Sequence, residues 1–225
     1  MVAVAVAATG PRLHGMSREF DVERLYAARN AAELSAEYDR VAENYDAALI
    51  EDHDWRMPEI MAGLVAWLLP RTARILDAAC GTGLVGAGLH HYGFSDLHGI
   101  DSSPGMIAVA RRKSLYASLE VGTLGAPLRY ATATFDAFTV AGAFTPKHAP
   151  ADSLIELLRV TRPGSYAIFS LRSDVDQPDF AAQIAALTAA GRWSLLREGA
   201  DFQSLPRAEP QVRNRLYVYQ LSRTP

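Results

Sequence analysis

Hydrophobic and polar positions along most of this chain follow the pattern of strands that alternate with helices. Short apolar runs bounded by Gly, Pro or Asp predict strands at residues 73–77, 97–101, 119–123, 134–140 and 165–171. The stretches between them have helical spacing, and the helices are expected at residues 84–92, 104–113, 151–160 and 177–190. This alternation indicates an α/β fold with right-handed crossovers and a parallel sheet.

The two ends of the chain depart from this alternation. Residues 31–50 are rich in Ala and Glu and lack Gly and Pro, and residues 59–69 are an apolar stretch that Pro70 ends, so two helices precede the first strand. Near the C-terminus, residues 193–198 and 215–221 have strand character with no long helix between them. We therefore expect these two strands to pair antiparallel at one edge of the sheet.

Two helix boundaries have a specific local cause. Ser103 stands before Pro104, which predicts a hydroxyl at the N-cap and a proline at the first helical position. Pro163-Gly164 follows a stretch that carries Arg159 and Arg162, a combination typical of a helix end.

Composition restricts the class of protein. The 225 residues fit one domain with a small appendage, and 49% of them are hydrophobic, enough for a sizeable core. The net charge of −3 gives no reason to expect nucleic acid or an anionic membrane as a partner. No stretch of 18 apolar residues occurs, and the single cysteine, Cys80, suits a reducing compartment such as the cytoplasm. We expect residues 1–15 to form a mobile tail.

The strongest chemical feature is a pair of acids at the ends of two predicted strands. RILDAACGTG at 74–83 is an apolar strand that reaches Asp77 and runs into a glycine turn, and HGIDSSPGM at 98–106 is another that ends at Asp101. Two such carboxylates with a glycine loop between them predict a nucleoside-binding site.

The nature of the nucleoside follows from the first acid. GTGLVG at 81–86 matches the dinucleotide pattern G-x-G-x-x-G, but Asp77 would face a pyrophosphate unfavourably. A carboxylate there suits a cationic ligand, such as the ammonium and sulfonium of S-adenosylmethionine. Gly81 and Gly83 would let the backbone pass close to that ligand. Asp101 can accept hydrogen bonds from both ribose hydroxyls.

These motifs are shared with one family. ILDAACGTG at 75–83 resembles motif I of the class I S-adenosylmethionine-dependent methyltransferases, and GIDSSPGMIAVAR at 99–111 resembles motif II. FDAFTVAGAF and LLRVTRPGSYAIF are similar to later strands of that family, and YDRVAENYD at 38–46 to its N-terminal lid helix. The similarity runs in order from about residue 36 to residue 172. DAACGTGLVG, YGFSDLHGIDSSPGM, WRMPE and GTLG are most similar to the methyltransferase-like protein 27 group within it.

The resemblance implies a Rossmann-like methyltransferase fold and S-adenosylmethionine as cofactor, with S-adenosylhomocysteine as product. The fold would have a seven-stranded, mostly parallel sheet with a C-terminal antiparallel pair, a helical lid at residues 16–70 and the main domain at residues 71–225. The reaction would be in-line methyl transfer to a small molecule, without nucleic acid or membrane as partner. The oligomeric state stays open.

The resemblance also assigns roles to single residues. Tyr38 and Tyr45, seven positions apart and so on one helix face, would close over the cofactor, although that face also suits core packing. Arg56 would pair with the cofactor carboxylate, or else form an ion pair with Glu59 or Asp52. The other assigned residues surround the methionyl group, ribose, adenine and methyl group: Asp77, Ala79, Cys80, Gly81, Gly83, Asp101, Ser102, Met106, Thr123, Leu124, Val140, Ala141 and Gly142.

A dedicated catalytic residue is not required, because the sulfonium is already an activated leaving group. His53 and His148 are the weak candidates for a general base, and solvated loop histidines are the alternative. Cys80 is expected to pack rather than react, since no basic residue adjoins it. No cluster has metal-site spacing. Two other functions remain open: a non-catalytic cofactor-binding or interaction protein, and an NAD(P)-dependent oxidoreductase.

Overall fold

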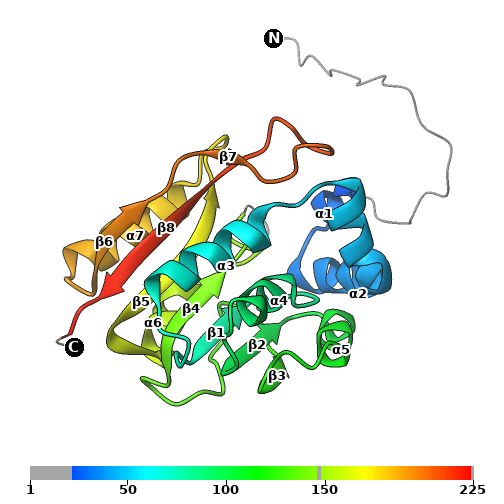
Figure 1. Cartoon of the computed structure of the whole chain (residues 1–225). Helices are drawn as coiled ribbons and strands as arrows, with labels where there is room; N and C mark the ends of the chain where they lie inside the picture. Colours follow the sequence, from blue (N-terminus) through cyan, green and yellow to red (C-terminus); the bar gives the residue numbers. More distant parts are fainter. Residues whose placement is uncertain (1–21, 146–147, 224–225) are drawn as a thin grey trace, which may run out of the picture.

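The computed structural model describes residues 22–145 and 148–223, and the expected tail at residues 1–15 lies outside them (Figure 1). Helices and strands alternate through most of the chain. The helices are α1 (Val22–Ala27), α2 (Ala31–Ala47), the π-helical turn η1 (Ala48–Asp52), α3 (Met57–Leu68), α4 (Leu84–His91), α5 (Pro104–Arg112), α6 (Ser153–Val160) and α7 (Pro178–Ala189). The strands are β1 (Ile75–Ala78), β2 (Leu97–Asp101), β3 (Ser118–Val121), β4 (Phe135–Val140), β5 (Thr161–Arg172), β6 (Trp193–Glu198), β7 (Phe202–Gln203) and β8 (Arg213–Leu221).

The strands form one mixed sheet in the order β3-β2-β1-β4-β5-β8-β6. The first five pair in parallel, and β8 pairs antiparallel with both β5 and β6, which confirms the predicted parallel sheet and its antiparallel pair. The described residues form eight strands rather than the expected seven, because the two-residue β7 also pairs with β8. A strand of two residues is too short to produce an alternating pattern in the sequence.

Helices cover both faces of the sheet, and each face has its own core. Figure 1 shows α3 and α4 in front of the strands and α6 and α7 behind them. Ile75 of β1 belongs to the core under α3 and α4, whereas its neighbour Leu76 belongs to the core under α6 and α7. Successive side chains of a strand point to opposite faces, so a strand between two helical layers is apolar throughout.

Three parts of the fold differ from the sequence prediction, apart from shifts of one or two residues at the ends of other elements. Helix α1 was not expected, and the helix expected at 31–50 is α2 followed by η1. The helix expected to end before Pro163-Gly164 does end there, at Val160, but strand β5 begins at once, at Thr161 rather than at residue 165, so Arg162 and Pro163-Gly164 already lie in the strand. A register shift between β4 and β5 accommodates them, and proline is tolerated in a sheet at such irregularities.

The lid helix α2 is held to the main domain through α5. Ser103 caps α5 as predicted, accepting a hydrogen bond from Met106 N at 3.0 Å. Asp39 of α2 accepts from Ser103 Oγ at 2.5 Å and from Gly105 N at 2.7 Å. Lys113, just after α5, pairs with Asp46 of α2 at 2.5 Å. These contacts fix the helix face that carries Tyr38 and Tyr45.

No helix among the described residues has the length and apolar character needed to cross a membrane.

Helices α3 and α4 approach closely at Gly88, which makes a direct test of this packing. A Cβ at Gly88 would lie 2.8 Å from the Cβ of buried Ala62, too close for two carbon atoms. We expect Gly88→Ala to lower the free energy of unfolding by about 1–3 kcal/mol in urea denaturation. Gly63→Ala in α3 is the matched control, since its Cβ would meet only Tyr92 Oη at 3.5 Å. The control should gain up to about 1 kcal/mol from helix propensity. Equal effects of the two substitutions would contradict the packing described.

Candidate functional site

The glycine loop after β1 is tied to the acid at the end of β2. Cys80 N donates to Ile100 O at 2.9 Å, and Gly81 N donates to Asp101 Oδ2 at 2.8 Å. The other Asp101 oxygen accepts from Ser103 N at 2.9 Å. Both carboxylate oxygens retain acceptor capacity, because each can accept more than one hydrogen bond. Burial raises the pKa of Asp101.

The loop needs a left-handed backbone at three positions. Gly81 and Gly83 have φ of 54° and 89°, as their residue type predicts, and Ala79 has φ of 59°. A non-glycine residue in this region is uncommon, and such strain collects at ligand sites. The sequence gives no sign of the strain at Ala79.

Asp77 lies beneath this loop, on the side of the sheet that faces α3 and α4. It is 1% exposed, and accepts hydrogen bonds from Tyr116 Oη at 2.7 Å and Thr139 Oγ1 at 3.0 Å. Burial raises the pKa of Asp77 to about 6, against the lowering effect of these two hydroxyls. The acid that the sequence places beside the cofactor is therefore a buried acid under the loop.

The third glycine of the loop motif makes room for the tyrosine that binds Asp77. A Cβ at Gly86 would lie 2.1 Å from Tyr116 Oη, and one at Gly83 would lie 2.9 Å from Tyr116 Cε2. Tyr116 was not identified from the sequence, because nothing in its surroundings marks a contact with a strand 39 residues away. In the sequence, only the glycines at positions 83 and 86 indicate that a bulky side chain packs against this turn.

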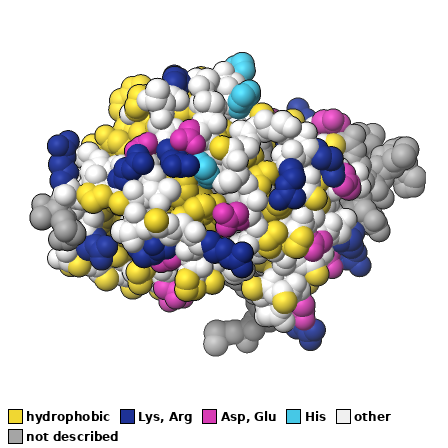
Figure 2. All heavy atoms as spheres, turned by 90° about the horizontal axis from the view of Figure 1, so that it is seen from below, with side chains coloured by type: hydrophobic (Ala, Val, Ile, Leu, Met, Phe, Trp, Pro, Cys, Tyr) yellow, Lys and Arg dark blue, Asp and Glu magenta, His cyan; other side chains and the backbone are white. Residues whose placement is uncertain are grey.

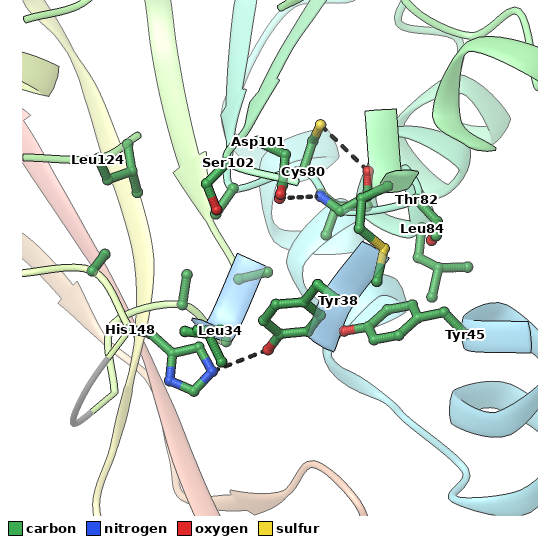
Figure 3. A pocket seen from close by; sticks show the side chains of 18 of the residues that line it. Leu34, Tyr38, Tyr45, Cys80, Thr82, Leu84, Asp101, Ser102, Leu124 and His148 are labelled. Carbon is green, nitrogen blue, oxygen red and sulfur yellow. Dashed lines mark hydrogen bonds between the residues drawn. The ribbon is translucent and has the colours of Figure 1, made fainter. Parts of the chain in front are cut away.

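A cavity opens above the loop, between the carboxyl ends of the strands and α2 (Figure 3). Its empty space is about 990 Å³, with the open solvent at its mouth included. The sequence-predicted residues that line it are Tyr38, Tyr45, Ala79, Cys80, Gly81, Asp101, Ser102, Met106, Thr123, Leu124, Ala141, Gly142 and the base candidate His148. The structure thus brings most of the predicted set to one cavity.

Four of the residues that were predicted to bind the cofactor do not line this cavity: Arg56, Asp77, Gly83 and Val140. Val140 is fully buried in the core under α6 and α7. Arg56 pairs with Asp54 at 2.8 Å, two residues away, rather than with Glu59 or Asp52. Asp54 has a left-handed backbone with φ of 56°, which the sequence does not reveal.

Of the two base candidates, only His148 reaches the cavity. Its Nε2 lies 3.0 Å from the Tyr38 hydroxyl, and its Nδ1 lies 2.8 Å from Thr145 Oγ1. Figure 3 shows the imidazole pointing toward the Tyr38 ring across the mouth of the site. His53 lines neither this cavity nor its neighbour, and burial lowers its pKa.

A second cavity adjoins the first, with an empty space of about 680 Å³. Tyr38, Tyr45, Trp55, Gly142 and His148 line both cavities and form the wall between them. The remaining lining residues are Leu25, Leu49, Met57, Thr145, Arg172, Ser204, Leu205, Glu209, Val212 and Asn214. The site is therefore two connected chambers that meet at the lid tyrosines.

The Cys80 thiol is buried, and burial raises its pKa well above the usual value, so it has no thiolate character. Across the residues that the structure describes, no group of three or more His, Cys, Asp or Glu side chains could hold a metal ion.

The chain has clear relatives. The family model "Methyltransferase domain" matches residues 75–164. Human methyltransferase-like protein 27 is 36% identical over 184 residues, which cover 76% of this chain and 73% of that protein. A demethylmenaquinone methyltransferase of Renibacterium salmoninarum is 32% identical over 138 residues, 59% of this chain and 55% of the relative.

Solved structures share the fold. A TehB-like S-adenosylmethionine-dependent methyltransferase of Corynebacterium glutamicum matches with a TM-score of 0.63 and 20% identity, over 83% of this chain and 99% of that one. At this identity the match shows the fold, and the human relative shows the family.

The glycine loop, the acid at the end of β2 and the cavity above them thus occur in a chain with these relatives and this fold. The chain belongs to the class I S-adenosylmethionine-dependent methyltransferases.

Proposed function

We propose that this enzyme methylates a small molecule that binds in the second cavity. The observation that supports this proposal is the shared wall: both chambers are lined by Tyr38, Tyr45, Trp55, Gly142 and His148 and so meet there. The lid helices and the segment before β8 enclose the second chamber on several sides. A concave, largely apolar chamber suits a small ligand better than a polymer.

The charge of the protein supports a small acceptor. The net charge is −3, and on the face shown in Figure 2 basic and acidic side chains are interspersed. A nucleic-acid substrate would favour a basic stripe. One relative is named a demethylmenaquinone methyltransferase, and the part of it matched by this chain covers 55% of its length. The name of that relative agrees with a small-molecule acceptor.

The cofactor would occupy the first cavity. Asp101 would accept hydrogen bonds from the ribose hydroxyls, and Gly81 would leave room for the methionyl group. The walls beside the adenine would come from Ser102, Met106, Thr123 and Leu124, and the floor under the methyl group from Ala141 and Gly142. Bound there, S-adenosylmethionine supplies an electrophilic methyl group on a good leaving group.

The contribution of the protein is then alignment and exclusion of water. Tyr38 and Tyr45 pack edge to face, with ring centroids 6.1 Å apart, and would cover the cofactor. Holding two reactants in near-attack geometry lowers a barrier by roughly 7–11 kcal/mol.

We also propose a reducing compartment such as the cytoplasm, because the single cysteine of the chain is a buried thiol.

The acceptor class is tested by labelling. The purified protein is incubated with tritiated S-adenosylmethionine and a cell extract that ultrafiltration has divided into small molecules and macromolecules. We expect most of the transferred label in the small-molecule fraction. The Asp101→Ala variant, which lacks the proposed ribose contact, gives the background. Label confined to RNA or protein would overturn a small-molecule acceptor.

We also propose that Asp77 supports the loop as a buried acid, which predicts a pH-dependent stability. Its pKa of about 6 in the folded protein lies above the ordinary value of 3.8. Between these values the folded protein holds a proton that the unfolded chain has lost. The stability that this group contributes is therefore present below about pH 4 and lost as the pH rises through 6.

Replacement of Asp77 by Asn removes this dependence. Relative to wild type, we expect the unfolding free energy of Asp77→Asn to rise by about 1–3 kcal/mol between pH 4 and pH 7. Urea denaturation at several pH values measures the difference. Glu59→Gln, on the exposed side of α3, is the control and should track wild type. A constant difference between Asp77→Asn and wild type would show that the acid titrates normally.

A further inference from the structure

The second cavity combines an apolar body with one well-oriented proton acceptor. Its shared wall carries three aromatic rings, those of Tyr38, Tyr45 and Trp55. Leu49 and Leu205 are among the aliphatic side chains that line the rest of the chamber. Such a lining favours a flat, largely apolar molecule.

Charges inside this chamber are balanced. Arg172 and Glu209 are the charged side chains of the lining, one of each sign. The Arg172 guanidinium also donates two hydrogen bonds to the Asp174 carboxylate, which accepts a further one from Arg213 N at 3.2 Å. The chamber as a whole therefore favours a neutral ligand over a carboxylate or an ammonium ion.

His148 is the imidazole at the junction of the two chambers, which it lines together with Tyr38 and Tyr45. Thr145 Oγ1 lies at its Nδ1 and Tyr38 Oη at its Nε2, at 2.8 Å and 3.0 Å. In the tautomer whose Nδ1 donates to Thr145, Nε2 accepts the Tyr38 proton. The Tyr38 oxygen then faces the chambers as an acceptor for a further hydrogen bond.

We propose that the second cavity binds a small aromatic molecule with an acidic hydroxyl group, and that Tyr38 relays the proton of this hydroxyl to His148. This inference rests on the proposed function, of which it specifies the acceptor class. A neutral imidazole can take a proton from a phenol far more readily than from an aliphatic alcohol. Tyr38 contacts the acceptor, and Thr145 is a positioning residue.

The step balances in atoms and charge. The acceptor oxygen forms a bond to the methyl carbon, and the carbon–sulfur bond breaks with its electron pair staying on sulfur. The proton of the acceptor hydroxyl passes to the Tyr38 oxygen as the Tyr38 proton passes to Nε2 of His148. The products are an aryl methyl ether, a neutral thioether and an imidazolium, which releases its proton to solvent.

Several other titratable or charged groups surround this relay. Tyr45 comes from the same helix as Tyr38, and its burial raises its pKa well above the usual value. Arg172 of β5 and Glu209 before β8 face the second chamber, and Asp101 of β2 faces the first. A positive Arg172 would also favour a bound phenolate, so the test must separate its effect from that of the imidazole.

The test uses 4-nitrophenol, whose phenolate absorbs visible light, and protein saturated with S-adenosylhomocysteine, so that no methyl transfer occurs. We expect saturable binding and a larger ionised fraction in the bound probe than in the free probe. At about one pH unit below the midpoint of the free probe, the ratio of ionised to neutral probe should rise about tenfold on binding. Absorbance titration measures both quantities.

Variants separate the parts of the proposal. Leu205→Trp fills the second cavity and should abolish probe binding, while the affinity for S-adenosylhomocysteine, measured by calorimetry, stays within about twofold of wild type. His148→Gln keeps a hydrogen-bonding side chain without basicity, and should bind the probe but lose the ionisation shift. Thr145→Val should reduce that shift in part. Leu196→Trp, on the exposed side of β6, is the matched control for Leu205→Trp.

The contrary results are equally specific. Absence of saturable binding, or binding that Leu205→Trp leaves intact, would overturn the assignment of the cavity. An unchanged ionisation shift in His148→Gln would assign the effect to Arg172 and overturn the relay. Probe binding is measured with S-adenosylhomocysteine and without methyl transfer, so these results are independent of the labelling experiment. Label found only in macromolecules would overturn the proposed function, whereas the probe experiment would still report whether the second cavity binds and ionises a phenol.

Discussion

The hydrogen bond from Gly81 N to Asp101 holds the site together. It joins the loop after β1 to the end of β2, at 2.8 Å, and so sets the floor of the first cavity. The parallel register that aligns Ala78 with Ile100 brings the two strand ends side by side. The left-handed backbone at Gly81 then turns the loop back over the carboxylate. Asp77, beneath the loop, and Tyr116, in the space left by Gly86, support it from below.

The lid extends this arrangement to the acceptor. Asp39 binds the N-terminal end of α5, the helix that directly follows Asp101, so α2 is positioned by the same segment that ends β2. Tyr38 and Tyr45 thereby come to stand between two chambers. Residues of a single helix thus line both cavities, and in the function proposed above this helix would couple cofactor binding to the shape of the acceptor site.

Most of the fold could be predicted from the sequence, because a doubly covered sheet requires continuous apolar strands. Ile75 and Leu76 illustrate this, since each is buried in a different core. The prediction was wrong where local patterns are ambiguous. The helix end before Pro163-Gly164 was predicted correctly, but the early start of β5 at Thr161, with its register shift against β4, was not. The strand β7 has only two residues and leaves no pattern.

The site was predictable where the residue type itself indicates the role: glycine at a left-handed turn, as at Gly81, and a carboxylate at a strand end that can accept hydrogen bonds, as at Asp101. It was not predictable where the role depends on a distant partner. Tyr116 binds Asp77 from 39 positions away. Arg56 is a different case, because several acids lie near it in the sequence and only the structure shows that Asp54 is its partner. The second cavity joins residues from the first lid helix to the segment before β8, a combination that only the folded chain reveals.

The most direct measurement is a crystal structure of the complex with S-adenosylhomocysteine. The account predicts the ribose hydroxyls on Asp101, the adenine between Met106 and Leu124, and the sulfur directed toward the wall formed by Tyr38, Tyr45 and Gly142. The second cavity should remain open to solvent or an acceptor. A ribose bound away from Asp101, or a cofactor that extends through that wall and fills both cavities, would contradict the two-chamber arrangement.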